Sequence, residues 1–216
     1  MGGRADSPIV FAITGASGAP YAVRLLEQLL VAERHVQLVV SSHGLRLLQT
    51  ETGIDSVETL RTRVGAPAWD RLVTAFDDKD RGAAPASGSA LTAGMVVCPC
   101  SMGTLAAISY GSSRSLVERA ADVTLKERRR LVLVPRETPL SAVHLANMLR
   151  VTRAGALVLP AAPGFYHHPS SISDLVDFIV ARILDHLEVE QTLTPRWSGG
   201  RGDGARAPGP HPRERS

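Results

Sequence analysis

The sequence predicts an α/β fold in which helices cover both faces of one doubly wound parallel sheet. Short apolar runs alternate with amphipathic stretches along the chain, as they do when parallel strands are joined by helices. Apart from Thr14 and Gln37, the strand-length runs are apolar, which is typical of strands buried on both faces. The length of 216 residues suffices for one sizeable domain with a core of its own.

The strands and helices are predicted from the length and period of the apolar residues. The runs predicted as strands are 9–14, 36–40, 95–98, 131–134 and 156–159. The stretches predicted as helices are 21–31, 45–51, 101–108, 115–127, 141–153 and 173–187. The less regular segment 55–90 is predicted to hold a short helix and an edge strand over 72–76. We therefore expect one domain over 8–198, with disordered ends at 1–7 and 199–216.

The charge and hydropathy of the chain exclude several classes of partner. The net charge is +3, and the tail 199–216 supplies +2 of it through four Arg against one Asp and one Glu. Because no basic face accompanies the pI of 9.2, we expect no nucleic-acid partner. No apolar run reaches membrane-spanning length and no secretory signal follows the first Met, so we expect no membrane association and a cytoplasmic location.

The cysteines and histidines do not predict a metal or redox site. Cys98 and Cys100 are spaced too closely for a zinc or redox pair, so we interpret them as small buried apolar residues in a reducing cytosol. The histidines show no metal-ligand spacing with carboxylates, and we expect no metal at His43, His144, His167 and His168.

Small residues follow the first predicted strand. The turn reads Thr14-Gly15-Ala16-Ser17-Gly18-Ala19-Pro20. Such a turn lets backbone N–H groups at a helix start approach an anion, and the helix dipole adds about half a positive charge there. The spacing matches neither Gly-x-Gly-x-x-Gly nor a Walker loop. It therefore predicts either an anion site or simply a tight connection between strand and helix.

Hydroxyl residues follow two further strands at the same edge of the predicted sheet. Ser41 ends the second strand, and Ser101 opens the helix that carries Thr104. Ligands of open parallel sheets bind outside the carboxyl ends of the strands, whereas Ser is also a common helix N-cap. Both roles can coexist, and the two turns together favour an anionic ligand at this edge.

Charged and aromatic residues complete the candidate site. Arg136-Glu137 follows the fourth predicted strand and is either a site pair or a salt-bridged loop. The basic run 126–130 before that strand reads as a solvated helix end. The Pro-rich loop 160–169 carries Phe165 and Tyr166, which wall an apolar pocket or cover the following helix as an ordinary lid.

Long blocks of the sequence, in order, resemble the UbiX flavin prenyltransferases. The blocks are Ile13-Thr14-Gly15-Ala16-Ser17-Gly18-Ala19, Pro85-Ala86-Ser87-Gly88-Ser89, Cys98-Pro99-Cys100-Ser101-Met102, the run 119–129, the run 131–140 and Pro163-Gly164-Phe165-Tyr166-His167. The similarity extends from about residue 9 to residue 197. Several blocks in the right order are far more specific than any one of them.

The resemblance implies a flavodoxin/Rossmann-like three-layer sandwich that assembles as a homododecamer of trimers, with active sites at the contacts between subunits. It implies an enzyme that joins a dimethylallyl group, from dimethylallyl monophosphate, to N5 and C6 of reduced FMN. The expected product is prenylated FMN, the cofactor of UbiD-type decarboxylases, and no metal is expected. Which decarboxylase is served, and whether the donor is the monophosphate or the pyrophosphate, stay open.

The resemblance also assigns roles to residues. The FMN site is expected to comprise Gly15, Ala16, Ser17, Ser41, Ser101, Met102, Gly103, Thr104 and Arg136. The residues expected to bind the isoprenyl substrate or line its pocket are Tyr166, Arg182, Lys126, Ser87, Ser89, Glu51, Arg119 and Trp197. The expected catalytic residues are Glu137, Lys126 and Ser17. Gly103 departs from the family, in which many members carry Lys or Arg, and this removes a possible side-chain contact to FMN.

The chemistry of the implied reaction suits these residue types. A phosphate leaving group carries about two negative charges, so Lys126 and Arg182 would stabilise the charge that grows as the C–O bond breaks. Glu137 is a candidate acid for the departing phosphate. Tyr166 and Trp197 offer aromatic faces to an allylic cation.

Two other functions remain open at this point. FMN-dependent cysteine decarboxylases share the fold but use a catalytic His in the first helix, and no His lies between Ser17 and Val31. A non-catalytic flavin carrier, or a subunit of a decarboxylase complex, would bind FMN without forming the prenyl adduct.

Overall fold

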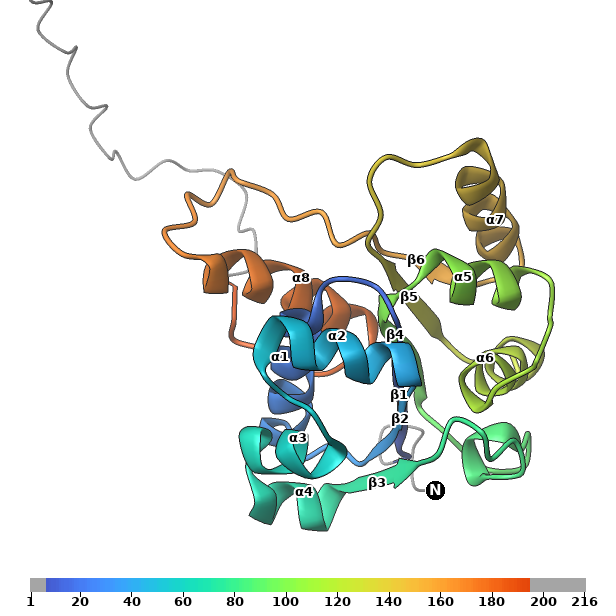
Figure 1. Ribbon diagram of the computed structural model, residues 1–216, viewed down its shortest axis with the longest axis horizontal. Coiled ribbons are helices and arrows are strands. Elements are labelled where there is room, and N and C mark those ends of the chain that lie inside the picture. Colours follow the sequence, from blue (N-terminus) through green and yellow to red (C-terminus); the bar gives the residue numbers. More distant parts are fainter. Residues whose placement is uncertain (1–6, 195–216) are drawn as a thin grey trace, which may run out of the picture.

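The computed structural model describes residues 7–194, which form a parallel sheet flanked by helices on both sides (Figure 1). The six strands of this part are β1 (Ile9–Ile13), β2 (Val36–Val40), β3 (Val73–Phe76), β4 (Gly94–Cys100), β5 (Leu131–Pro135) and β6 (Leu157–Val158). Their order is β3-β2-β1-β4-β5-β6, and all neighbours are parallel. This Rossmann order reverses direction between β1 and β4, which is where such sheets bind ligands.

The helices form the two outer layers of the sandwich. They are α1 (Ala19–Val31), α2 (Ser42–Thr52), α3 (Val57–Val64), α4 (Ala66–Leu72), α5 (Met102–Ser109), α6 (Leu116–Lys126), α7 (Ala142–Arg153) and α8 (Ile172–His186). Figure 1 shows α1, α2, α3 and α8 on one side of the sheet and α5, α6 and α7 on the other. No helix within residues 7–194 combines the length and apolar character needed to cross a membrane.

The core has two halves because successive strand residues point to opposite faces. Ile9, Phe11 and Ile13 of β1 pack in the cluster that includes the buried faces of α1 and α8. Val10 and Ala12 of the same strand pack in the cluster beneath α5 and α6. All five residues are buried, which explains why the strand reads as a continuous apolar run.

The segment 55–90 is the part of the fold that the sequence predicted least well. It contains two helices, α3 and α4, where one was expected, and a short 3₁₀ helix over Ala84–Ala86. Ser56 caps α3 by accepting a hydrogen bond from the Thr59 N–H at 3.0 Å, and Gly65 separates α3 from α4 with a φ of 106°. Leu72 ends α4 and does not begin β3.

The other predicted elements agree with the structure within a few residues. β4 extends beyond the predicted 95–98 at both ends, whereas β6 is shorter than the predicted 156–159. The predicted disorder of 1–7 and 199–216 lies outside the described residues, apart from Ser7, and so does Trp197.

Candidate functional site

Thr14 joins the ends of β1 and β4 at the point where the strand order reverses. Its buried hydroxyl donates a 2.9 Å hydrogen bond to the Pro99 carbonyl and accepts one of 2.9 Å from the Ser101 N–H. The Thr14 N–H also donates to the Pro99 carbonyl at 3.2 Å. These bonds hold the turn after β1 beside the start of α5. No role for Thr14 was predicted from the sequence, although a buried hydroxyl at the end of a strand requires a hydrogen-bond partner.

The start of α1 is capped by a carboxylate of the chain itself. Glu51, in the last turn of α2, accepts hydrogen bonds from the Gly18 N–H at 2.9 Å and from the Ala19 N–H at 2.7 Å. A carboxylate at this place also satisfies the positive end of the helix dipole. The amides of Gly18 and Ala19 are therefore engaged within the protein, and a bound anion would need other donors.

A small charged cluster surrounds Ser17. Arg136 reaches back from the end of β5, and its Nε donates to the Ser17 carbonyl at 3.4 Å. Partial burial acts to raise the pKa of Glu51, but hydrogen bonds from Gly18, Ser17 and Ala19 and the charge of Arg136 outweigh it, so that this pKa lies below its ordinary value. Glu51 is thus ionised at neutral pH and holds the turn between β1 and α1 in place.

The serines that follow β2 and β4 are helix N-caps, as one reading of the sequence expected. Ser41 accepts a hydrogen bond from the Gly44 N–H at 3.1 Å, and Ser101 accepts one from the Thr104 N–H at 3.1 Å. Within residues 7–194, the N–H groups of Met102 and Gly103 have no acceptor. These two donors, at the positive end of α5, can hold an anionic or carbonyl group of a ligand.

Two glycines of the expected FMN site differ in their surroundings. A Cβ added at Gly15 would lie 2.5 Å from His43 Cβ, so Gly15 allows the turns after β1 and β2 to pack together. A Cβ added at Gly103 would meet nothing closer than Ser101 Oγ at 3.9 Å. A side chain at position 103 would therefore meet no obstruction, and Gly103 leaves that space unfilled.

A second group of predicted site residues gathers at the opposite edge of the sheet. Lys126 ends α6 just before β5 and forms an ion pair with Glu127 at 2.5 Å. A Cβ added at Gly88 would lie 2.9 Å from Lys126 Nζ, so the segment 87–89 lies beside Lys126. In this segment the hydroxyls of Ser87 and Ser89 share a 2.9 Å hydrogen bond. Arg119 is two turns earlier on α6 and pairs with Asp122 at 2.9 Å.

The two groups do not meet within one chain. Lys126 precedes β5 and Glu137 follows it, and the five residues of β5 separate the two edges by roughly 16 Å at about 3.3 Å per residue. Arg182 lies on α8 in the layer opposite α6 and pairs with Asp185 at 3.3 Å. A site that uses all of these residues must therefore draw them from more than one chain.

Exposed side chains gather at the carboxyl edge of the sheet. Arg136 and Glu137 are exposed, and 70% of the surface of Tyr166 is accessible. Tyr166 rests edge-on against Phe178 of α8, with ring centroids 5.9 Å apart. Phe178 was not predicted from the sequence as a site residue, although an aromatic residue on the helix that follows an aromatic loop can pack against that loop.

A hollow of about 700 Å³ lies beside Glu51 and is lined by residues of α1, α2 and α8. Arg24 and Asp177 face it and form a two-point ion pair at 2.7 and 3.2 Å. Glu51 therefore lies between this hollow and the turn that holds Ser17.

The cysteines have no part in this chemistry. Cys98 and Cys100 are fully buried and unpaired, as the sequence predicted. Burial raises the pKa of Cys100 to about 12, so its thiol stays protonated at neutral pH. Within the described part of the chain no three His, Cys, Asp or Glu side chains come together as a potential metal site.

Comparisons with known proteins agree with the fold and show the family to which the chain belongs. The Flavoprotein family model matches residues 4–184. The flavin prenyltransferase UbiX of Pseudomonas aeruginosa is 50% identical over 196 residues, which cover 88% of this chain and 93% of that protein.

Two solved structures are similar along nearly their whole length. AnUbiX (PadA1), in complex with FMN and dimethylallyl pyrophosphate, is 42% identical with a TM-score of 0.82, covering 90% of this chain and 99% of that one. A dodecameric FMN-dependent UbiX-like decarboxylase from Escherichia coli O157:H7 is 41% identical with a TM-score of 0.81, covering 89% of this chain and 100% of that one. The FMN-dependent cysteine decarboxylase TvaF, at 15% identity and a TM-score of 0.57 over 84% of this chain and 98% of that one, shares the fold alone.

Proposed function

We propose a role for each site residue in the reaction of this chain. The chain belongs to the flavoprotein family and, within it, to the UbiX flavin prenyltransferases. The chain is a flavin prenyltransferase, and FMN is the flavin that receives the prenyl group. When bound in its reduced form, FMN supplies the nucleophilic atoms of the reaction. The protein supplies binding, orientation and charge.

FMN binding is assigned to the carboxyl edge of β1, β2 and β4. The observation that carries this assignment is that the Met102 and Gly103 N–H groups, at the strand-order reversal, have no acceptor within residues 7–194. Arg136, held against the Ser17 carbonyl, adds a positive charge at the same edge. Glu51 orders the turn that contains Ser17 and, because it already caps α1, directs the flavin's anionic groups toward α2 and α5.

The donor is assigned as dimethylallyl monophosphate, whose C–O bond breaks while the allylic carbon bonds to the flavin. Lys126 and Arg182 neutralise the phosphate that leaves with the bonding electrons, and Glu137 delivers a proton to it. Tyr166, supported by Phe178, and Trp197 shield the allylic carbon from water and face its positive charge. Ser87, Ser89 and Arg119 line the same pocket from the α6 side.

We assign the donor pocket to the boundary between subunits. The separation of Lys126 from Glu137 by the length of β5 supports a shared site, since one chain alone cannot bring both to one phosphate. A relative at 41% identity is dodecameric, and we assign this chain a dodecamer that is built from trimers.

The product, prenylated FMN, is assigned to a UbiD-type decarboxylase that uses it as a cofactor. We assign the reaction to the cytoplasm, in keeping with two buried, unpaired cysteines. The cysteine-decarboxylase alternative has less support, because the relatives of that kind share only the fold and the first helix lacks a His.

The direct test is to incubate the protein with reduced FMN and dimethylallyl monophosphate, or with the pyrophosphate, and to weigh the released flavin by mass spectrometry. The proposal predicts the mass of the dimethylallyl adduct with the monophosphate. Binding of FMN without any adduct from either donor would instead indicate a flavin carrier.

A further inference from the structure

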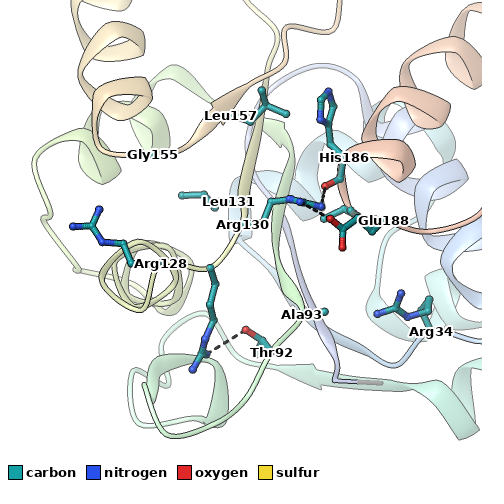
Figure 2. A pocket seen from close by; sticks show the side chains of 12 residues that line it. Arg34, Thr92, Ala93, Arg128, Arg130, Leu131, Gly155, Leu157, His186 and Glu188 are labelled. Carbon is teal, nitrogen blue, oxygen red and sulfur yellow. Dashed lines mark hydrogen bonds and ion pairs between the residues drawn. The ribbon is translucent and has the colours of Figure 1, made fainter. Parts of the chain in front are cut away.

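A cavity of about 540 Å³ opens at the amino edge of the sheet, opposite the edge that carries Arg136 (Figure 2). It lies among the starts of β5 and β6, the end of α8 and the turn between α1 and β2. Its charged or titratable lining residues are Arg34, Arg128, Arg129, Arg130, His186 and Glu188. None of the residues assigned above to flavin prenylation lines it.

The cavity carries an excess of positive charge. Its lining includes four guanidinium groups but one carboxylate, that of Glu188. Glu188 pairs with Arg130 at 2.7 Å, while its side chain is 76% exposed. Figure 2 shows Arg130 directed toward Glu188 and the His186 carbonyl, with Arg128 pointing away from them. The four Arg and one Glu leave three positive charges around one small volume.

Within residues 7–194, Arg34 Nη2 and Gln37 Oε1 are buried without a hydrogen-bond partner, and of these two residues Arg34 lines the cavity. Arg34 follows α1 in the turn that leads to β2. A buried charged donor without an acceptor destabilises a protein unless a ligand or an ion supplies the acceptor. Arg129, in contrast, is fully used by the Gly88 and Ala90 carbonyls at 2.6 and 2.7 Å.

The remaining walls suit a small organic molecule. Leu131, Leu157 and Leu187 supply apolar surface, and the volume lies in the range of small-molecule sites. Burial, together with the charges of Arg182 and Arg130, lowers the pKa of His186, so that its imidazole is neutral at pH 7 and can donate or accept a hydrogen bond.

We propose that this cavity binds a small phosphate monoester or inorganic phosphate, at a site separate from the one where the donor phosphate leaves. A dianion compensates most of the three-charge excess and lies against the guanidinium group of Arg34, one of whose nitrogens has no hydrogen-bond partner within residues 7–194. The planar guanidinium group of Arg34 matches the oxygens of a phosphate, while that of Arg130 is held at the cavity by the His186 carbonyl and Glu188.

The test uses the full-length protein and radiolabelled inorganic phosphate in equilibrium dialysis. Arg34→Met keeps the length and apolar stem of the side chain but removes the charge, and we expect it to weaken this phosphate site by about tenfold or more. The prenylation rate should stay at the parent value, because Arg34 is remote from Arg136. Arg71→Met is the matched control, since Arg71 pairs with Glu33 at 2.9 Å outside the cavity. Equal phosphate affinity and stoichiometry in the parent and Arg34→Met would overturn the proposal.

A second variant changes affinity in the opposite direction. Glu188→Gln removes the carboxylate from the cavity lining, so phosphate should bind several-fold more tightly. Glu33→Gln is the matched control, because Glu33 and Glu188 are both exposed glutamates with positive φ, of 52° and 57°, and each pairs with one arginine. Weaker phosphate binding by Glu188→Gln, or an equal gain in Glu33→Gln, would also overturn the proposal.

Discussion

Glu51 accepts a 2.7 Å hydrogen bond from the Ala19 N–H, so that a carboxylate of the protein itself caps the N-terminus of α1. The turn after β1 is therefore ordered before any ligand arrives. Its glycines and small residues serve close packing, and the free N–H donors lie at the start of α5.

Removing the Glu51 cap should destabilise the fold. Glu51→Ala leaves the Gly18 and Ala19 N–H groups without their acceptor, and we expect the free energy of unfolding to fall by about 1–2 kcal/mol. Glu51→Gln keeps an acceptor and should lose less. Urea denaturation checks both variants against Glu190→Ala, a change at an exposed glutamate. A loss no greater than that of the control would remove Glu51 as a structural cap.

The contribution of Glu51 to stability should depend on pH. Because its folded-state pKa is depressed below the ordinary value of about 4.3, the stabilisation is fully present above that value and is lost as the pH falls through the folded-state pKa. The stability difference between the parent and Glu51→Gln should therefore be constant from pH 7 to about pH 5 and shrink below pH 4. A difference that grows on acidification would contradict the depressed pKa.

Gly15 and Gly103 should respond differently to the addition of a methyl group. Gly15→Ala brings a Cβ to 2.5 Å from His43 Cβ and should cost about 1–3 kcal/mol, whereas Gly103→Ala meets open space inside a helix and should be neutral or stabilising by up to about 1 kcal/mol. Thermal unfolding separates the two. Loss of FMN by a Gly15→Val variant would not show that FMN contacts Gly15, because the clash with His43 also disturbs the packing of the two turns. Equal stability losses at both glycines would contradict this distinction.

The phosphate-handling residues should affect the rate but not flavin binding. Lys126→Ala and Glu137→Gln should each slow single-turnover prenylation by roughly 30- to 1,000-fold, the equivalent of about 2–4 kcal/mol in the transition state. FMN occupancy should be unchanged, since the flavin donors are at Met102 and Gly103. Lys79→Ala and Glu190→Gln are the controls for loss of one surface charge. If both site variants react at the parent rate, neither residue takes part in the reaction, and Lys126 is simply a solvated residue at the end of α6.

The sequence predicted the strands, the carboxyl edge and the serine caps because these depend on local pattern. β1 and β2 are apolar on both faces, and Ser41 and Ser101 directly precede helices. It could not predict that Glu51 caps α1, because the two are more than 30 residues apart and meet only through the packing of α2 on α1. The two helices in segment 55–90 were missed because they are too short for a strong periodic signal.

The resemblance implied a site shared between subunits, but the spacing of its residues along the chain does not show this division. The motif blocks that contain Lys126 and Glu137 are near neighbours in the chain, yet β5 lies between them and carries them to opposite edges of the sheet. The sequence did not predict a role for Arg34 either, because the burial of its Nη2 depends on tertiary packing and the cavity forms only where the α1–β2 turn meets β5 and α8.

The central claim is that one active site takes Lys126 and Glu137 from different subunits, and complementation between two inactive variants tests it most directly. Lys126→Ala and Glu137→Gln are co-expressed with different tags, mixed oligomers are isolated, and the prenylated flavin is measured by mass spectrometry. If neighbouring subunits each contribute one residue, about a quarter of the sites in randomly mixed trimers are intact, and the rate should recover to roughly 25% of the parent value. Mixed oligomers of Lys126→Ala with the Lys126→Ala/Glu137→Gln double variant should stay inactive. If the first mixture also stays inactive while its oligomers contain both chains, the shared site is wrong.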